Sequence, residues 1–230
     1  MAKFEVKQGH GIIPEGTTEI SDESFAGCQD LEHIVFPDSV MIIHSWAFED
    51  CKSLKSIEFK GDIMTIGAGA FENCTSLTSL VFHKDVMKIE ICAFAGCSSL
   101  TNLEFREGIM RIGNQAFDNC IGLSSIVIPH TVSDLRATAF SECTGIETIQ
   151  FKGWMICDMY WLINAMMSAG EGDDGLGNYA HIRRGRLKKI LVPKGAKEFY
   201  KNQMMKTYEL EHYGDLDRIY ASLIEESTTG

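Results

Sequence analysis

The chain lacks the long apolar run that a membrane-spanning helix needs. No stretch of about 18 uncharged apolar residues occurs anywhere in it. Its first 25 residues carry charges throughout, so they do not resemble a secretion signal. These two absences lead us to expect a cytoplasmic protein, or a secreted or cell-surface one if the sequence was trimmed at its start. Hydrophobic residues at 45% and charged residues at 23% are the proportions of a globular protein.

The chain also has fewer basic than acidic residues. The chain holds 21 lysines and arginines against 32 acidic residues, a formal net charge of −11. Such a surface repels polyanions, so we expect no nucleic acid partner. One basic cluster, Arg183–Lys189, departs from this balance. We favour a solvated edge beside the acidic repeats for this cluster, with contact to nucleic acid or acidic lipid as the alternative.

The residue patterns of metal, cofactor and catalytic sites are missing as well. There is no CxxC pair, and the seven histidines show no metal-ligand spacing. No Ser–His–Asp, Cys–His or paired-carboxylate arrangement stands out. Gly170, Gly172 and Gly175 formally match GxGxxG, but they follow an expected helix. The neighbouring Asp173 and Asp174 would repel phosphate. We therefore expect that the chain is not an enzyme and has no catalytic, cofactor-binding or metal-binding residues.

What the chain has instead is an internal repeat. Six of its eight cysteines are spaced 23 residues apart: Cys28, Cys51, Cys74, Cys97, Cys120 and Cys143. Aromatic residues keep the same step: Phe25, Phe48, Phe71, Phe94, Phe117 and Phe140. Aliphatic residues do so too: Ile34, Ile57, Leu80, Leu103, Ile126 and Ile149. Six units therefore cover residues 14–152 without insertion or deletion, which identifies a repeat protein.

Each unit carries a helical turn followed by a strand. Phe48, Cys51 and Leu54 are spaced by three, which places them on one side of a short helical turn. Ile57 and Phe59 alternate with polar residues, which is the period of a strand. One unit is too short to bury these side chains alone, so stacked units must share a core. The sequence predicts an α/β solenoid with a parallel β-sheet, short helical turns and a helical C-terminal cap. Its cysteines are expected to be buried free thiols rather than redox switches.

The unit also resembles a known repeat. Residues 66–77 read Ile-Gly-x-x-Ala-Phe-x-x-Cys-x-x-Leu, which resembles the BspA-like subfamily of leucine-rich repeats. Residues 190–200 resemble the closing segment of many such proteins. A regular asparagine ladder, usual in the general leucine-rich pattern, is absent. The resemblance implies a right-handed superhelix and a bacterial protein. It also implies adhesion at the bacterial surface to host or neighbouring-cell proteins.

The repeat register breaks after Lys152, which divides the chain. We expect a solenoid over residues 1–152 with an N-terminal cap in 1–13, an insertion over 153–186, and a closing strand and helix over 187–230. Within the insertion, the Trp- and Met-rich segment 154–169 is expected to be a cap helix, followed by a flexible acidic loop. A hydrophobic groove or dimer contact at 154–169 is the alternative. Cys92 and Cys157, which lie outside the cysteine column, are expected to be packed thiols rather than nucleophiles.

The residues between the buried strand positions define a candidate protein-binding surface. They vary from unit to unit and are expected to face outward from the sheet: His33, Val35, Ser56, Glu58, Ser79, Val81, Asn102, Glu104, Ser125, Val127, Thr148 and Gln150. So broad a face suits a protein partner better than a small molecule. We therefore predict a noncatalytic protein-interaction module, adhesin-like if the resemblance extends to function. The alternatives are a cytoplasmic scaffold that forms homo-oligomers through 154–169, and an enzyme with its site in 154–186.

Overall fold

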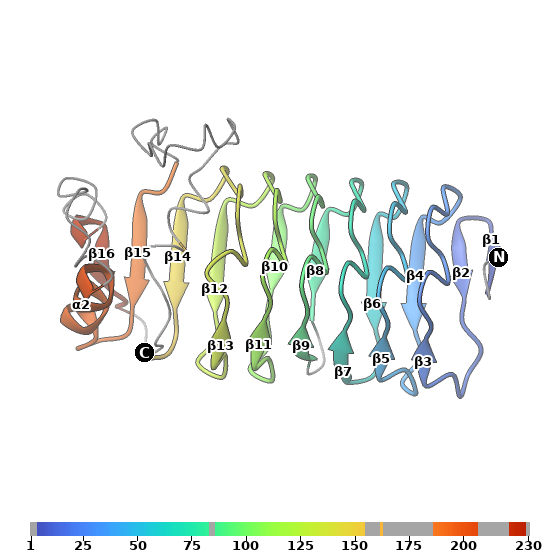
Figure 1. Ribbon diagram of the computed structural model, residues 1–230, viewed down its shortest axis with the longest axis horizontal. Helices are drawn as coiled ribbons and strands as arrows, with labels where there is room; N and C mark the ends of the chain where they lie inside the picture. Colours follow the sequence, from blue (N-terminus) through green and yellow to red (C-terminus); the bar gives the residue numbers. More distant parts are fainter. Residues whose placement is uncertain (1–3, 83–85, 155–161, 163–185, 207–220, 229–230) are drawn as a thin grey trace.

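The computed structural model describes residues 4–82, 86–154, 162, 186–206 and 221–228. Within this part the chain winds into a solenoid whose strands lie side by side, in chain order, from one end to the other (Figure 1). Each repeat contributes one coil that carries two short strands joined by turns. The predicted fold class, a repeat solenoid built on parallel strands, is confirmed.

The repeat strands of the first row, within residues 33–151, occupy the positions that alternation predicted, and further strands extend the row at both ends. It comprises β1 (Glu5–Lys7), β2 (His10–Ile12), β4 (His33–Phe36), β6 (Ser56–Phe59), β8 (Ser79–Val81), β10 (Asn102–Glu104), β12 (Ser125–Ile128), β14 (Thr148–Phe151), β15 (Lys189–Val192) and β16 (Ile224–Glu226). Paired neighbours run parallel, except β1 and β2, which are antiparallel. The row is not one continuous sheet. It pairs in three blocks, β1-β2-β4-β6, β8-β10 and β12-β14-β15-β16.

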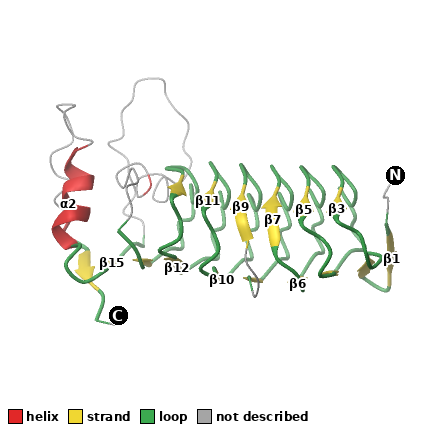
Figure 2. Ribbon diagram, turned by 90° about the horizontal axis from the view of Figure 1, so that it is seen from below, coloured by secondary structure: helices red, strands yellow, loops and turns green. Residues whose placement is uncertain are grey.

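A second row of strands, which the sequence did not lead us to expect, forms one continuous six-stranded parallel sheet. Its members are β3 (Glu19–Ile20), β5 (Ile42–Ile43), β7 (Ile63–Ile66), β9 (Val86–Ile89), β11 (Arg111–Ile112) and β13 (Asp134–Leu135). In Figure 2 these strands line the side of the coils away from the first row. The buried residues of β7 and β9 are their first and last, with two residues facing outward between them. That spacing of three hides the strand from a search for strict alternation.

Stacked phenylalanines form the spine of the core. The rings from Phe25 to Phe140 are at most 1% exposed, and successive ring centroids lie 4.8–5.3 Å apart. A second stack begins at Phe36 and Phe59, and the Phe36 ring meets the Phe48 ring edge-on at 5.6 Å. Burying one such side chain contributes roughly 1.5–3 kcal/mol. Because each ring packs on its counterpart in the next coil, this burial exists only in the stack.

The segment predicted as a short helical turn is a succession of tight turns instead. The Cys51 amide bonds the Phe48 carbonyl, and the Leu54 amide bonds the Cys51 carbonyl, each three residues back. The Phe48 amide, however, donates to the Ala70 carbonyl of the next coil, at 2.7 Å. A backbone amide that donates to a neighbouring coil cannot also donate to the carbonyl four residues back, as an α-helix requires. The repeats therefore contain turns, and the described α-helix α2 (Lys197–Lys206) lies beyond them.

The cysteine column supplies a side-chain ladder in place of asparagines. The Cys51 Sγ donates to the Phe25 carbonyl oxygen of the preceding coil at 3.0 Å. Four further coils repeat this bond at 3.0–3.4 Å: Cys74 to Phe48, Cys97 to Phe71, Cys120 to Phe94 and Cys143 to Phe117. These five cysteines are buried and free, whereas Cys28 is half-buried. The thiols thus pack as small apolar groups. They also donate a hydrogen bond to buried carbonyl oxygens, each of which can accept more than one.

Both ends of the core are covered. At the N-terminal end β1 and β2 form a hairpin, and the Phe4 ring stacks on the Phe25 ring with centroids 5.4 Å apart. At the other end Tyr200 of α2 is fully buried, and its ring lies 5.2 Å from that of Phe151. The closing strand β15 begins at Lys189, within the segment predicted to close the fold. The later strand β16, which pairs with β15, was not predicted.

Candidate functional site

The first strand row holds the twelve predicted surface residues on its outer side. In β6, for example, Ile57 and Phe59 point into the core, while Ser56 and Glu58 are exposed. The other strands keep this alternation, and none of the twelve residues is buried. Parallel pairing without slippage sets the twelve residues in two lines along the solenoid. Whether these residues bind a partner stays a prediction.

Four residues missed by the sequence reasoning extend this face at both ends. In β2, His10 pairs with His33, and their rings stack with centroids 5.1 Å apart. In β15, Lys189 and Leu191 pair with Thr148 and Gln150, and Glu225 of β16 pairs with Leu191. His10 stands one repeat before His33, so the register could have revealed it. β15 and β16 do not follow the 23-residue step, so the repeat register could not have revealed Lys189, Leu191 or Glu225. We call these sixteen residues the outer strand face.

A groove opens on this face where the strand pairing is interrupted. β6 and β8 belong to different blocks, although they are neighbours in the row. Between them lies a groove of about 390 Å³ lined by Ser56, Ile57, Glu58, Phe59, Ser79 and Val81. Four of these lining residues are predicted surface residues, and Ile57 and Phe59 belong to the core. The groove therefore combines hydroxyl groups, one carboxylate and apolar carbon, a mixture that suits the side chain of a partner.

Polar contacts order the side chains on either side of the groove. The His33 Nδ1 lies 2.7 Å from the Ser56 Oγ. On the other side, the Asn102 amide donates to the Ser79 Oγ and to a Glu104 carboxylate oxygen, both at 3.2 Å. The contacts of Ser56 and Ser79 join neighbouring strands, and the Asn102–Glu104 contact lies within β10, so together they hold the outer side chains in defined positions.

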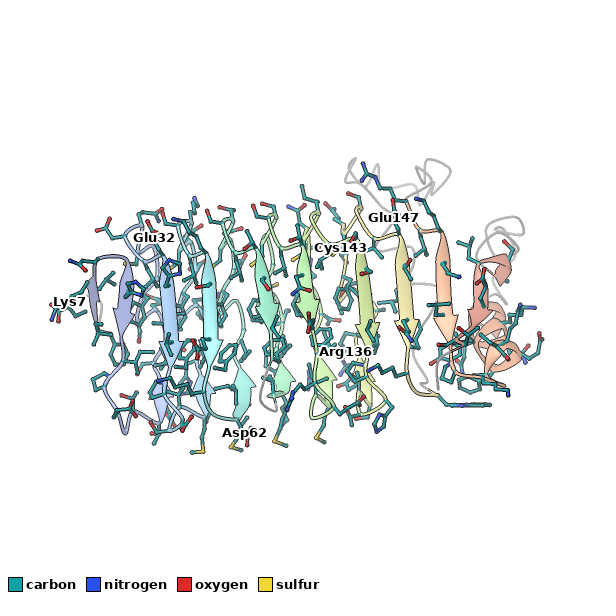
Figure 3. All side chains as sticks on the ribbon, turned by 180° about the vertical axis from the view of Figure 1, so that it is seen from behind. Lys7, Glu32, Asp62, Arg136, Cys143 and Glu147 are labelled. Carbon is teal, nitrogen blue, oxygen red and sulfur yellow. The ribbon has the colours of Figure 1, made fainter. Side chains whose placement is uncertain are left out.

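The acidic groups on this face and at its edge differ in whether a cation pairs with them. At one edge of the coils the Lys55 Nζ donates to a Glu32 carboxylate oxygen at 2.6 Å, and this hydrogen bond lowers the pKa of Glu32. Figure 3 shows Glu32 at the edge opposite to Asp62. Glu58 differs, because no cation of the described residues lies within ion-pair distance of it. A carboxylate with no cationic partner in the described part of the chain thus stands on the rim of the groove.

Other candidates from the sequence are placed differently. Burial raises the pKa of the half-buried Cys92 thiol, which is consistent with a packed thiol rather than a nucleophile. Lys188 and Lys189 of the basic cluster pair with Glu147 and Glu225 at 2.9 and 2.7 Å. Among the described residues no group of three His, Cys, Asp or Glu side chains is arranged to hold a metal ion.

The insertion lies almost wholly outside the described residues. Of the expected cap 154–169, the structure describes only Trp154 and Leu162, and the glycine-rich loop after it is not described. The Leu162 side chain is buried, and the Trp154 ring lies 5.4 Å from that of Phe199. Within the described part of the chain, no helix is both long and apolar enough to cross a membrane.

Together these features define a class of protein: a repeat solenoid of 23-residue coils with parallel strand ladders and a variable outer face. The family description "BspA type Leucine rich repeat region" matches residues 9–90 and 64–156, in six copies. The chain belongs to this family, which confirms the resemblance seen in the sequence. Leucine-rich repeat proteins are in general binding modules or surface proteins rather than catalysts.

Solved structures of bacterial leucine-rich repeat proteins are similar to the chain. A T. pallidum leucine-rich repeat protein is 26% identical, with a TM-score of 0.58 over 71% of this chain and 85% of that one. A leucine-rich cell surface protein from Faecalibacterium prausnitzii is also 26% identical, with a TM-score of 0.49 over 61% of this chain. A protein from Eubacterium ventriosum is 26% identical, with a TM-score of 0.47 over 52% of this chain. The chain spans 45% and 32% of the last two proteins. A search of curated proteins found no match.

Proposed function

We propose that the chain is a noncatalytic protein-interaction module that binds its partner on the outer strand face and serves in adhesion at a cell surface. The observation that carries the proposal is the groove between β6 and β8, because it lies within the line of variable outer residues. Family membership supports an interaction role, since repeat solenoids bind partners along extended faces.

The groove suits the side chain of a lysine or arginine on the partner. Glu58 offers a carboxylate that has no ion-pair partner among the described residues. Val81, which faces outward, offers apolar carbon beside it. A long basic side chain packs its methylene stem on such carbon and keeps its charge at the rim. The acidic excess of the chain further favours a basic partner over an acidic one.

Cell binding tests this proposal. The fluorescently labelled full chain is incubated with cultured epithelial cells and with intact bacteria, and bound label is measured by flow cytometry. Glu58→Lys is compared with Glu23→Lys, which makes the same charge change at an exposed position in a turn segment. We expect Glu58→Lys to weaken binding at least about tenfold and Glu23→Lys to leave it unchanged. Trypsin treatment of the cells should abolish binding if the partner is a protein.

Three results would count against the proposal. Failure of the unaltered chain to bind either kind of cell would remove the adhesion role. Equal binding by Glu58→Lys and the unaltered chain would remove the groove from the binding surface. A large loss of stability in Glu58→Lys, beyond about 0.5 kcal/mol, would show that this strand position is covered in the folded chain.

A further inference from the structure

A row of exposed methionines runs along the second strand row, away from the outer strand face. It consists of Met41, Met64, Met87 and Met110, which keep the 23-residue step of the repeat. Their exposed fractions are 43%, 48%, 37% and 44%. Figure 3 shows sulfur atoms projecting side by side from the edge of the solenoid where Asp62 lies. We call these four residues the methionine row.

The backbone fixes neighbouring members of the row directly beside one another. The Met64 amide donates to the Met41 carbonyl at 2.8 Å, and the Met110 amide donates to the Met87 carbonyl at 3.0 Å. The flanking pairs Ile63–Val86 and Thr65–Lys88 place Met64 opposite Met87. Adjacent parallel strands lie about 4.8 Å apart, so each thioether can reach the next by rotation of its flexible side chain.

Neither folding nor packing accounts for methionine at these positions. The side chains are exposed rather than filling gaps in the core, where methionine is ordinarily useful. β-Branched residues favour strands more than methionine does, and the same column holds Thr18 before the row and Ser133 after it. What the four residues share, and what threonine or serine lacks, is a soft sulfur ligand.

We propose that the methionine row binds a soft monovalent metal ion, Cu(I) or its analogue Ag(I), through thioether sulfurs from successive coils. Thioethers select such ions over harder divalent ones. A closed-shell ion also imposes little directional preference, so ligands from adjacent coils can share it. Arg111, beside Met110, is no obstacle, because Glu90 and Asp134 lie 3.8 and 3.5 Å from its guanidinium nitrogens and offset its charge. This site is independent of the outer strand face.

The row makes an internal prediction about which residues matter most. Any three consecutive methionines of the four include both Met64 and Met87. Replacing either of these central residues therefore breaks every three-sulfur set. Replacing Met41 or Met110 leaves one set intact. Met→Leu substitutions are suitable, because they preserve apolar volume and remove only the sulfur.

Silver titration followed by NMR tests the proposal. The full chain is labelled at its methionine methyl carbons and titrated with silver nitrate in a chloride-free buffer. All samples carry Cys28→Ala, Cys92→Ala and Cys157→Ala, so that thiols other than the five buried ones do not compete. We expect the methyl signals of the methionine row to shift together and saturate, while the remaining methionines serve as internal controls. Zn²⁺, which prefers thiolate and imidazole ligands, should leave these signals in place.

The variants decide the outcome. We expect Met64→Leu and Met87→Leu to weaken silver binding about tenfold or more, and Met41→Leu and Met110→Leu to weaken it less. The fourfold leucine variant should lose the site while keeping its circular dichroism spectrum. Equal effects of all four single variants would show independent surface thioethers and overturn the proposal. Absence of methyl shifts, or unchanged silver binding by the fourfold variant, would overturn it as well.

Discussion

Because the cysteine ladder is buried, we expect the free energy of unfolding to fall as the pH becomes alkaline. Burial raises the pKa of Cys51 and Cys97 from an ordinary value of 9.0 to about 12. Burial also raises the pKa of Cys74 and Cys120 well above the ordinary value. Between pH 9 and about pH 12 the folded chain keeps these thiol protons, whereas the unfolded chain releases them. The stabilisation is therefore fully present below pH 9.0 and is lost as pH rises through this window.

The magnitude follows from the number of thiols. Each thiol that is protonated when folded and ionised when unfolded lowers the free energy of unfolding by about 1.4 kcal/mol per pH unit. Four such thiols lower it by about 5 kcal/mol per pH unit once pH exceeds the unfolded pKa. Domains are typically stable by about 5–15 kcal/mol. We therefore expect the solenoid to unfold within about one to three pH units above the unfolded pKa of its thiols.

Urea titrations at several pH values between 7 and 11, under reducing conditions, measure this slope. The matched variant is Cys74→Ala together with Cys97→Ala, which removes two of the four titrating thiols. Its free energy of unfolding at pH 7 will be lower, because packing and two hydrogen bonds to carbonyls are lost. Its slope above pH 9 should be shallower than that of the parent by about 2.7 kcal/mol per pH unit, the contribution of two thiols. Other titrating groups are common to both proteins, so coincident slopes would refute the assignment of buried, protonated thiols.

Substitutions at two further positions test the core and its C-terminal cover. Phe71→Asp should abolish the cooperative unfolding transition followed by circular dichroism, because it places a charge between the stacked rings of Phe48 and Phe94; a parent-like melting curve would contradict the shared core. Tyr200→Phe keeps the ring on Phe151 but removes the hydroxyl that donates to the Gly153 carbonyl, so urea unfolding should show a loss of about 0.5–1.5 kcal/mol. Tyr200→Ala should cost about 3–5 kcal/mol, and equal losses in the two variants would argue against burial of this ring.

The core was predictable from the sequence because the repeat has a constant length. When every coil has 23 residues, a column of identical residues in the sequence becomes a stack of contacts in space. The Phe25-to-Phe140 column could be interpreted in this way without knowing the path of the chain between its members. The outer strand positions followed from the same register, since residues flanking a buried strand position point the other way.

Features that depend on the path within or between coils were not predictable. The second strand row has buried residues such as Val86 and Ile89 three apart, a spacing shared by turns and helices. The interruption between β6 and β8, and hence the groove, occurs between coils that share the same buried columns. Nothing in those columns distinguishes a paired junction from an unpaired one. Cys28 differs from the other cysteines because it belongs to the first coil, where the position one period before Phe25 is Ala2 rather than a phenylalanine.

Because every coil has the same length, a whole repeat can be removed without changing the register of the others. Excising residues 49–71, one full period, would join Phe48 to Glu72 and bring Cys74 to the place that Cys51 held. Every remaining column would close up by one strand spacing, about 4.8 Å. The shortened chain would retain its two end covers while losing β6 and Met64 together. The length of the solenoid can thus change by whole repeats, and each repeat carries its own residues of the outer strand face and of the side that holds the methionine row.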